Sequence, residues 1–237
     1  MHLKKITLRP ADYPVDDQYP FNLSIFRATD TVEFSVPVSF FIGENGSGKS
    51  TLLRAIAMKC GIHIWEGMER TRAHYNPHER AMYRYIDAAW AEGPVPGSFF
   101  ASEIFRNFAV NLDEWASMSP ATLDYFGGKS LLEQSHGQCH MSFFKSRFSR
   151  KGLYLLDEPE NALSPARQID LVRLLRDLAS DGHAQFIIAT HSPILLALPG
   201  ADIFSFDRAP IGRVRYEETD HYRIYQDFMA DPVGYIK

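Results

Sequence analysis

The amino-acid sequence predicts an α/β fold with a mixed, largely parallel sheet, an N-terminal antiparallel β portion and an inserted helical lobe. A glycine-rich turn at 43–48 joins an apolar run at 37–42 to a helical stretch. Two further apolar runs, 152–156 and 184–189, flank a helical pattern at 165–179. Strand, helix and strand at this spacing are typical of neighbouring parallel strands.

Length and composition favour one domain with one insertion. The chain has 237 residues, of which 45% are hydrophobic and 13% aromatic, and this is enough to bury a core. We expect a single domain over 1–237, with a mostly helical lobe inserted at about 61–148. Helical stretches at 78–91 and 102–115, separated by turn-rich segments, predict the lobe. The other predicted elements are strands at 3–9 and 31–35 and a helix at 131–148.

Charge and cysteine content exclude several classes of protein. The 25 basic and 29 acidic residues give a formal net charge of −4, so the chain has no global electrostatic footprint for nucleic acid. Cys60 and Cys139 form no paired framework or metal spacing, and the N-terminus lacks the apolar core of a signal peptide. No apolar run approaches the roughly 18 residues of a membrane-spanning helix. We therefore expect a cytoplasmic protein without membrane insertion.

The first chemical motif is the glycine-rich turn, which reads Gly43-Glu44-Asn45-Gly46-Ser47-Gly48-Lys49-Ser50-Thr51. Glycines let successive backbone N–H groups point at one anion, and the following helix places its positive end there. Lys49 adds a mobile cation for the outer phosphates, and the Ser50 hydroxyl is a ligand for Mg²⁺. A turn that merely links strand to helix is the alternative, which this register of glycines, lysine and serine disfavours. The motif predicts a nucleoside triphosphate site.

The second motif is an acidic pair, Asp157 and Glu158, at the end of the apolar run 152–156. Such a run is typical of a central parallel strand, whose carboxyl end exposes ligand-binding residues. We expect Asp157 to hold Mg²⁺, directly or through water, and Glu158 to polarise the attacking water. Acidic pairs also occur at strand ends without function, but the phosphate loop elsewhere in the chain favours the catalytic interpretation.

The third motif, Ala189-Thr190-His191-Ser192-Pro193, closes the next predicted strand. We expect His191 to lie at the same edge of the sheet as Asp157 and Glu158. There it could hydrogen-bond the γ-phosphate and sense its loss. A structural role is the alternative, because imidazoles readily satisfy buried polar groups.

With these motifs the chain resembles the ATP-binding-cassette (ABC) class of P-loop ATPases, and more closely the small bacterial AAA/ABC-like predicted ATPases. The closer resemblance rests on the run Asp-Glu-Pro-Glu-Asn-Ala-Leu-Ser-Pro at 157–165 and on Ala-Thr-His-Ser-Pro at 189–193. It covers most of the chain. The resemblance implies an ATP hydrolase that uses ATP and Mg²⁺.

In that class a signature of the form Leu-Ser-Gly-Gly-Gln precedes the acidic strand. Residues 134–138 read Gln-Ser-His-Gly-Gln, so His136 replaces the first glycine of the signature. The resemblance implies a head-to-tail dimer. In it, Ser135 and the backbone at Gly137 of one subunit face the γ-phosphate that Lys49 of the other subunit holds. A plain helix N-cap at Ser135 is the alternative.

Two departures from the class bear on function. Transporter-type cassettes carry a Gln between the phosphate loop and the signature, and no Gln occurs from 51 to 133, which argues against a transporter subunit. Glu103 is the candidate for its place, although an acid at a helix start also favours the helix dipole. Ser164 stands where the class usually has Asp, and with Pro165 it also fits a helix cap followed by the first helical residue.

Other residues have two interpretations. Phe21, Phe26 or the nearby Arg27 could stack on adenine, but core packing is favoured for each phenylalanine. His136 and His140 lie four apart on one predicted helix, where a solvated face is favoured over a metal pair. The amphipathic tail at 219–237 covers the sheet or meets a partner, and core coverage is favoured.

The motifs together predict a soluble ABC-type ATPase that acts as a conformational switch for a protein partner, which the sequence does not identify. The alternatives are the nucleotide-binding subunit of a membrane transporter and the ATPase of a DNA-repair or phage-defence complex. A local basic cluster is interpreted as a solvated loop, with a nucleic-acid contact as the alternative. Its members are Lys145, Arg147, Arg150 and Lys151.

Overall fold

A computed structural model describes residues 1–65, 76–119, 123–124, 128, 130–132 and 136–236. The strands are β1 (Leu3–Leu8), β2 (Thr31–Glu33), β3 (Val38–Ile42), β4 (Ile86–Trp90), β5 (Gly97–Ala101), β6 (Gly152–Asp157), β7 (Ala184–Ala189), β8 (Asp202–Ser205) and β9 (Gly212–Val214). The helices are α1 (Ser24–Ala28), α2 (Lys49–Lys59), α3 (Ser102–Met118), α4 (His136–Phe148), α5 (Pro165–Ser180), α6 (Pro193–Leu196), α7 (Asp220–Ala230) and α8 (Pro232–Ile236).

The larger sheet has the strand order β5-β6-β7-β3-β8-β9. Its strands from β5 to β8 are parallel, and β9 pairs antiparallel with β8 at the edge. The central strands β3, β6 and β7 are buried along their whole length, as strands covered on both faces must be. The three predicted apolar runs are therefore confirmed as central strands, and their carboxyl ends meet at one edge of the sheet.

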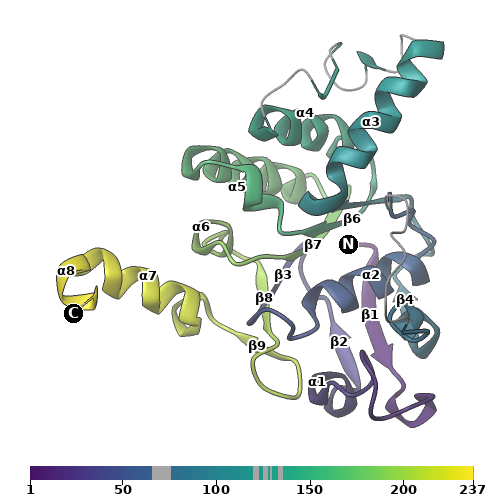
Figure 1. Ribbon diagram of the computed structural model, residues 1–237, viewed down its shortest axis with the longest axis vertical. Helices are drawn as coiled ribbons and strands as arrows, with labels where there is room; N and C mark the ends of the chain where they lie inside the picture. The colour runs from purple at the N-terminus through teal and green to yellow at the C-terminus, as the bar shows by residue number, and fades with distance from the viewer. Residues whose placement is uncertain (66–75, 120–122, 125–127, 129, 133–135, 237) are drawn as a thin grey trace.

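Two layers cover the larger sheet, one on each face (Figure 1). On one face, α2 and the antiparallel sheet β2-β1-β4 share a core with inward side chains of β6 and β7 such as Leu155 and Ile187. On the other face, α3, α4 and α5 share a core with Phe40, Leu156 and Phe186. The N-terminal antiparallel portion and the helical layer that the sequence predicts thus lie on opposite faces.

An aromatic cluster fills the space between the sheet and helices α3 and α4. The Phe100 ring on β5 lies 4.8 Å from the Phe144 ring and 5.1 Å from the Phe105 ring, measured between centroids. His140 is only 3% exposed, and its ring lies 4.9 Å from Phe100 and 4.7 Å from Phe105. The favoured assignment of His140 to a solvated face is wrong, because α4 turns this residue toward the sheet. Within the described residues no cluster of three potential metal ligands occurs.

The side-chain amide of Gln185 joins the two sheets. The Gln185 side chain, fully buried on β7, accepts hydrogen bonds from the backbone N–H groups of His2 and Leu3, at 2.8 and 2.7 Å. Its amide nitrogen, Nε2, donates to the Leu3 carbonyl oxygen at 2.8 Å. These bonds satisfy backbone groups at the start of β1, before its pairing with β2 begins at Lys5. Gln185 therefore fixes the antiparallel sheet against the larger one.

The predicted helix at 78–91 is wrong. Its second half is strand β4, which pairs antiparallel with β1 from Trp90 opposite Leu3 to Ile86 opposite Leu8. The residues before it form a short 3₁₀ helix, Ala81–Tyr85. The good helix formers in this segment are overridden because β1 offers a free edge for pairing.

The predicted lobe at 61–148 contains more than helices. Strands β4 and β5 within this range belong to the two sheets. The helices predicted from 102 and from 131 correspond to α3 and α4, and α4 begins at His136. The boundaries of the lobe stay a prediction.

The C-terminal segment forms an arm, residues 220–236, that projects away from the layers (Figure 1). Neither α7 nor α8 has a buried residue. The favoured prediction that this tail covers the core is therefore wrong. Its exposed apolar side chains include Ile224, Tyr225, Met229, Val233 and Tyr235.

Replacing Gln185 with Ala should lower the free energy of unfolding by roughly 3 kcal/mol, because the change leaves three buried backbone groups without partners. Urea unfolding followed by circular dichroism measures the effect. The matched control is Gln226→Ala on exposed α7. An unfolding midpoint equal to that of the control would show that Gln185 does not hold the sheets together.

Candidate functional site

The predicted site residues converge because β6, β7 and β3 are consecutive in the parallel sheet. The glycine-rich loop 43–48 leaves the carboxyl end of β3, Asp157 ends β6 with Glu158 following it, and His191 follows β7. The chain segments that carry these groups are far apart in sequence. Their juxtaposition at one edge, expected from the sequence, is observed.

The glycine-rich loop needs glycine for conformation and for space. Gly43, Gly46 and Gly48 have φ angles of 142°, 81° and 104°, a region that residues with a Cβ rarely adopt. A Cβ on Gly48 would also lie 2.7 Å from Cζ of Phe26. Phe26 is fully buried and packs beneath the loop, so its assignment to the core is confirmed. The loop is thus shaped around a tight turn into α2.

Lys49 begins α2 and lies over the loop. Its buried ammonium group donates to the carbonyl oxygens of Gly43, at 2.6 Å, and Glu44, at 2.8 Å. Burial lowers the pKa of Lys49, and the nearby carboxylates of Glu158 and Asp157 oppose that effect. A buried cation at a helix N-terminus that is hydrogen-bonded to carbonyl oxygens can exchange them for anionic oxygens.

Ser47 adds a polar group to the loop. Its buried hydroxyl oxygen has no hydrogen-bond partner within the described part of the chain. A buried polar group of this kind is expected to find a partner in a bound ligand or water. The loop therefore offers a hydroxyl as well as backbone amides and the Lys49 ammonium group.

The Ser50 hydroxyl donates to Oδ1 of Asp157 at 2.8 Å and joins α2 to the end of β6. Burial raises the pKa of Asp157 to about 6, although the Ser50 hydrogen bond and the charge of Arg54 act in the opposite direction. A hydroxyl beside a buried carboxylate is an oxygen donor pair that suits Mg²⁺. Ionisation of Asp157 is costly without a cation, so this pair fits the predicted metal site.

Glu158 has a left-handed backbone conformation, which contacts with the surrounding structure stabilise. Its φ is 49°, the one non-glycine positive value among the described residues. The Glu158 N–H donates to Ala189 O at 2.9 Å, and the Ser102 hydroxyl donates to Glu158 O at 2.6 Å. The Asn161 amide donates to its carboxylate Oε2 at 2.7 Å. Such a backbone costs about 1–3 kcal/mol and directs the carboxylate toward the loop side of the sheet edge.

His191 is fixed by three acidic or aromatic neighbours. Its backbone N–H donates to Oε1 of Glu160 at 2.7 Å. Its ring nitrogen Nε2 lies 3.8 Å from Oε1 of Glu158, and Nδ1 lies 3.2 Å from Nε2 of His221 on α7. Burial lowers the pKa of His191, and the charge of Lys49 lowers it further. The ring is therefore neutral near pH 7 and can offer one N–H.

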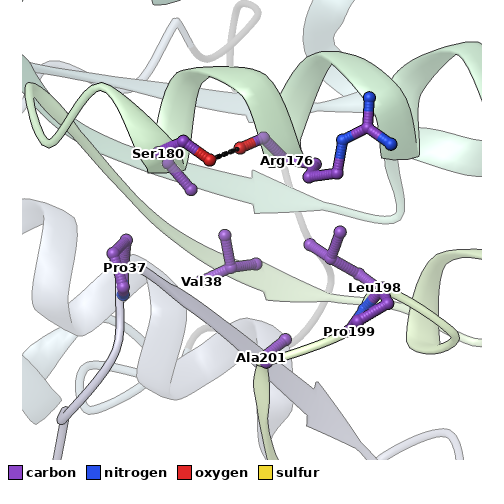
Figure 2. Close-up of a pocket in the computed structure, with 9 residues that line it drawn as sticks. Pro37, Val38, Arg176, Ser180, Leu198, Pro199 and Ala201 are labelled. Atoms are coloured by element: carbon purple, nitrogen blue, oxygen red, sulfur yellow. Dashed lines mark hydrogen bonds between the residues drawn. The ribbon is translucent and has the colours of Figure 1, made fainter.

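An open cleft of about 490 Å³ connects these groups, and Glu44, Asn45, Glu158 and His191 line it. A second hollow of about 210 Å³ lies where β3 begins, at the opposite edge of the sheet (Figure 2). Apolar groups such as Val38 and Leu198 line that hollow, and the Arg176 guanidinium pairs with Asp177 at 2.9 Å. The chemistry predicted from the sequence belongs to the first cleft.

Two residues of the site were missed by sequence reasoning. Asp207 follows β8, and its Oδ1 accepts a hydrogen bond from the Glu44 N–H at 3.0 Å. The short, mostly apolar run at 203–206 before Asp207 is a strand signal that could have found it. His221 has no such signal, because only the path of α7 brings it to His191.

The structure describes some of the remaining predicted site residues. Ser135 lies outside the described residues. Gly137 lies in the first turn of α4, where an added Cβ would be 2.9 Å from the Ala162 carbonyl oxygen. The Glu103 side chain is 81% exposed and lies 4.0 Å from Arg54. The Thr51 hydroxyl contacts the hydroxyl of Tyr19.

Comparisons with known proteins identify the family. Residues 21–72 match a family model described as "AAA domain", and residues 130–197 match one described as "AAA domain, putative AbiEii toxin, Type IV TA system". The cytochrome c biogenesis ATP-binding export protein CcmA of Rhodopseudomonas palustris (strain HaA2) is 32% identical over 171 residues, which span 65% of this chain and 77% of that protein. The chain is an ABC-type P-loop ATPase. As such it binds and hydrolyses ATP.

Further relatives of this ABC-type ATPase agree with that family. The thiamine import ATP-binding protein ThiQ of Ruegeria sp. (strain TM1040) is 27% identical over 64% of this chain and 69% of its own length. The structure described as "An inward-facing conformation of a putative metal-chelate type ABC transporter" shares the fold, with a TM-score of 0.54 and 16% identity. It covers 95% of this chain and 88% of that chain. In the described part of the ATPase, no helix is long and apolar enough to cross a membrane.

The Asp157→Asn variant of the ABC-type ATPase should be more stable than the parent at pH 7.5 without metal, by roughly 3 kcal/mol or less. The folded-state pKa of Asp157 is raised to about 6 from 3.8, so its ionisation destabilises the metal-free fold as pH rises through this window. Asn can still accept the Ser50 hydrogen bond. Urea unfolding in EDTA at pH 4 and pH 7.5 measures the difference, which should disappear at the lower pH. An equal difference at both pH values would contradict the burial argument.

Proposed function

We propose that this ABC-type ATPase works as an ATP-gated head-to-tail homodimer that switches a protein partner. The observation that carries the proposal is the placement of two helix starts. Lys49 begins α2 on one face of the parallel sheet, and Gly137 lies in the first turn of α4 on the other face. A helix N-terminus favours an anion, so α4 of one copy is suited to the γ-phosphate held by another copy.

The proposed roles follow the positions of the side chains. The amides of the loop 43–48 and the Lys49 ammonium group bind phosphate oxygens of ATP. Glu158 accepts a proton from the attacking water, whose oxygen forms a bond to the γ-phosphorus as the bond to the bridging oxygen of ADP breaks. His191 donates its ring N–H to the γ-phosphate. Ser135 and the backbone at Gly137 complete the anion site from the second copy.

We assign Mg²⁺ to Ser50 and Asp157. The Ser50 hydroxyl and the Asp157 carboxylate already meet at 2.8 Å, and burial of the carboxylate makes a cation its natural partner. Mg²⁺ would neutralise negative charge on the phosphate oxygens. Asp157 remains ionised when the cation offsets the cost of its burial.

Helix α4, which carries Gly137 of the predicted signature, contacts the turn that follows Glu158 in the same chain. Gly137 packs against the carbonyl oxygen of Ala162, in the 3₁₀ turn 159–162 that directly follows Glu158. A larger residue at Gly137 would push this turn away. The contact supports a switch in which closure of the dimer and placement of Glu158 occur together.

A transporter subunit is the second candidate function, favoured by the import and export proteins among the relatives. The absence of Gln from 51 to 133 and the altered signature weigh against it. Co-purification with a membrane protein would support it. The ATPase of a DNA-repair or phage-defence complex is the third, and the observation beside it is the match of 130–197 to a family model described as a putative AbiEii toxin of a Type IV TA system. Stimulation of ATP hydrolysis by DNA ends would support that function.

Replacing Glu158 with Gln should lower kcat by about 100-fold or more, because the proton acceptor is lost while the phosphate loop is intact. The variant should be a monomer without nucleotide and a dimer with ATP and Mg²⁺, as measured by light scattering after size exclusion. Glu217→Gln, at an exposed site, is the matched control. A Glu158→Gln variant that hydrolyses ATP at the parental rate would overturn the assignment of the base.

Replacing Ser135 with Arg should block dimerisation and hydrolysis, because a bulky cation would fill the space of the facing γ-phosphate. Binding of ATP to the monomer should be retained, with one nucleotide per chain by equilibrium dialysis. Loss of ATP binding in this variant would mean that Ser135 does not act from the second copy.

A further inference from the structure

The ring of His191 has a partner that comes from the C-terminal arm. His221 lies in the first turn of α7, and its Nε2 is 3.2 Å from Nδ1 of His191. The two ring centroids are 5.4 Å apart. No residue of α7 is buried, so packing of a core does not explain why this helix begins here.

Several hydrogen bonds fix the start of α7 beside His191. The Thr219 hydroxyl caps α7 by accepting from the Tyr222 N–H at 3.1 Å, and it donates to Tyr216 O at 2.7 Å. The Tyr216 hydroxyl donates to Pro193 O at 2.9 Å, two residues after His191. The helix start is therefore tied to the same loop that carries His191.

A hydrogen bond between two neutral imidazoles needs one N–H donor and one bare nitrogen. In one arrangement, Nδ1 of His191 carries the ring proton and donates to His221. Nε2 of His191 would then present a lone pair to the Glu158 carboxylate, which lies 3.8 Å away. That arrangement is repulsive. If His221 donates from Nε2 instead, the proton of His191 lies on Nε2 and faces Glu158 and the cleft.

The charges around the two rings are compatible with neutral imidazoles. Lys49 from α2, Glu158 after β6 and Asp207 after β8 face His191, and Asp220 on α7 acts on His221 as well. Burial is the largest influence on each ring and lowers both pKa values. At neutral pH both rings are therefore neutral, and each carries one N–H.

We propose that His221 is a positioning residue, which fixes the tautomer of His191 with the proton on Nε2, directed at Glu158 and the phosphate side of the cleft. The inference rests on the role proposed above for His191. The tautomer is set by the bond that the other ring nitrogen makes, as is general for histidine. The arm thereby supplies a part of the hydrolytic site that the sheet edge lacks.

The test uses His221→Phe, which keeps a ring but removes the donor, and His221→Gln, which restores a donor of similar reach. We expect His221→Phe to lower kcat about tenfold with KM for ATP unchanged, and His221→Gln to recover most of the loss. The matched control is His63→Phe, at an exposed site. Histidine ring ¹⁵N chemical shifts of the full-length protein should show Nε2 of His191 protonated in the parent and a mixed tautomer in His221→Phe.

The ring shifts separate this inference from the role of His191. A parent protein with the His191 proton on Nδ1, or an unchanged tautomer in His221→Phe, would overturn the inference whatever the rate of hydrolysis. A changed tautomer with unchanged kcat would support the assignment of His221 and overturn the role proposed for His191. Loss of activity in both His221 variants, with the parent tautomer retained, would also overturn the inference.

Discussion

The burial of the Asp157 carboxylate is the constraint on which the rest of the structure depends. A carboxylate at the end of a fully buried strand is costly, and the raised pKa expresses that cost. The Ser50 hydroxyl on α2 and the charge of Arg54 partly offset this cost. Strand β7 lies between β6 and β3, the strand that leads into α2. The layers on both faces are needed to exclude water from β6. Binding of a cation beside the phosphate loop would therefore offset the cost of ionising the buried Asp157 carboxylate.

Local sequence signals predicted the part of the fold that they dictate. Each of the runs at 37–42, 152–156 and 184–189 is apolar at every position or nearly so, and only a strand covered on both faces uses such a run. The motifs at Lys49, Asp157 and His191 follow these runs directly. Parallel pairing then brings them to one edge, so the main groups of the candidate site could be predicted.

The remaining features depend on contacts that no local pattern encodes. The segment 78–91 has helix formers, and its period-two burial becomes visible only when β1 supplies an edge. His140 fits a polar helix face until the aromatic cluster is known. Gln185 meets Leu3 across more than half of the chain. His221 lies on an arm whose direction is set by a few hydrogen bonds, so no sequence pattern predicts its contact with His191.

Glu158 places stability and function in opposition. A glycine would adopt the backbone angle of this residue without strain, whereas any side chain with a Cβ pays for it. Selection for a more stable fold alone would therefore favour glycine at this position. The Glu158 carboxylate is therefore held at the sheet edge at a cost in stability, as expected for a residue whose side chain serves the chemistry of the site.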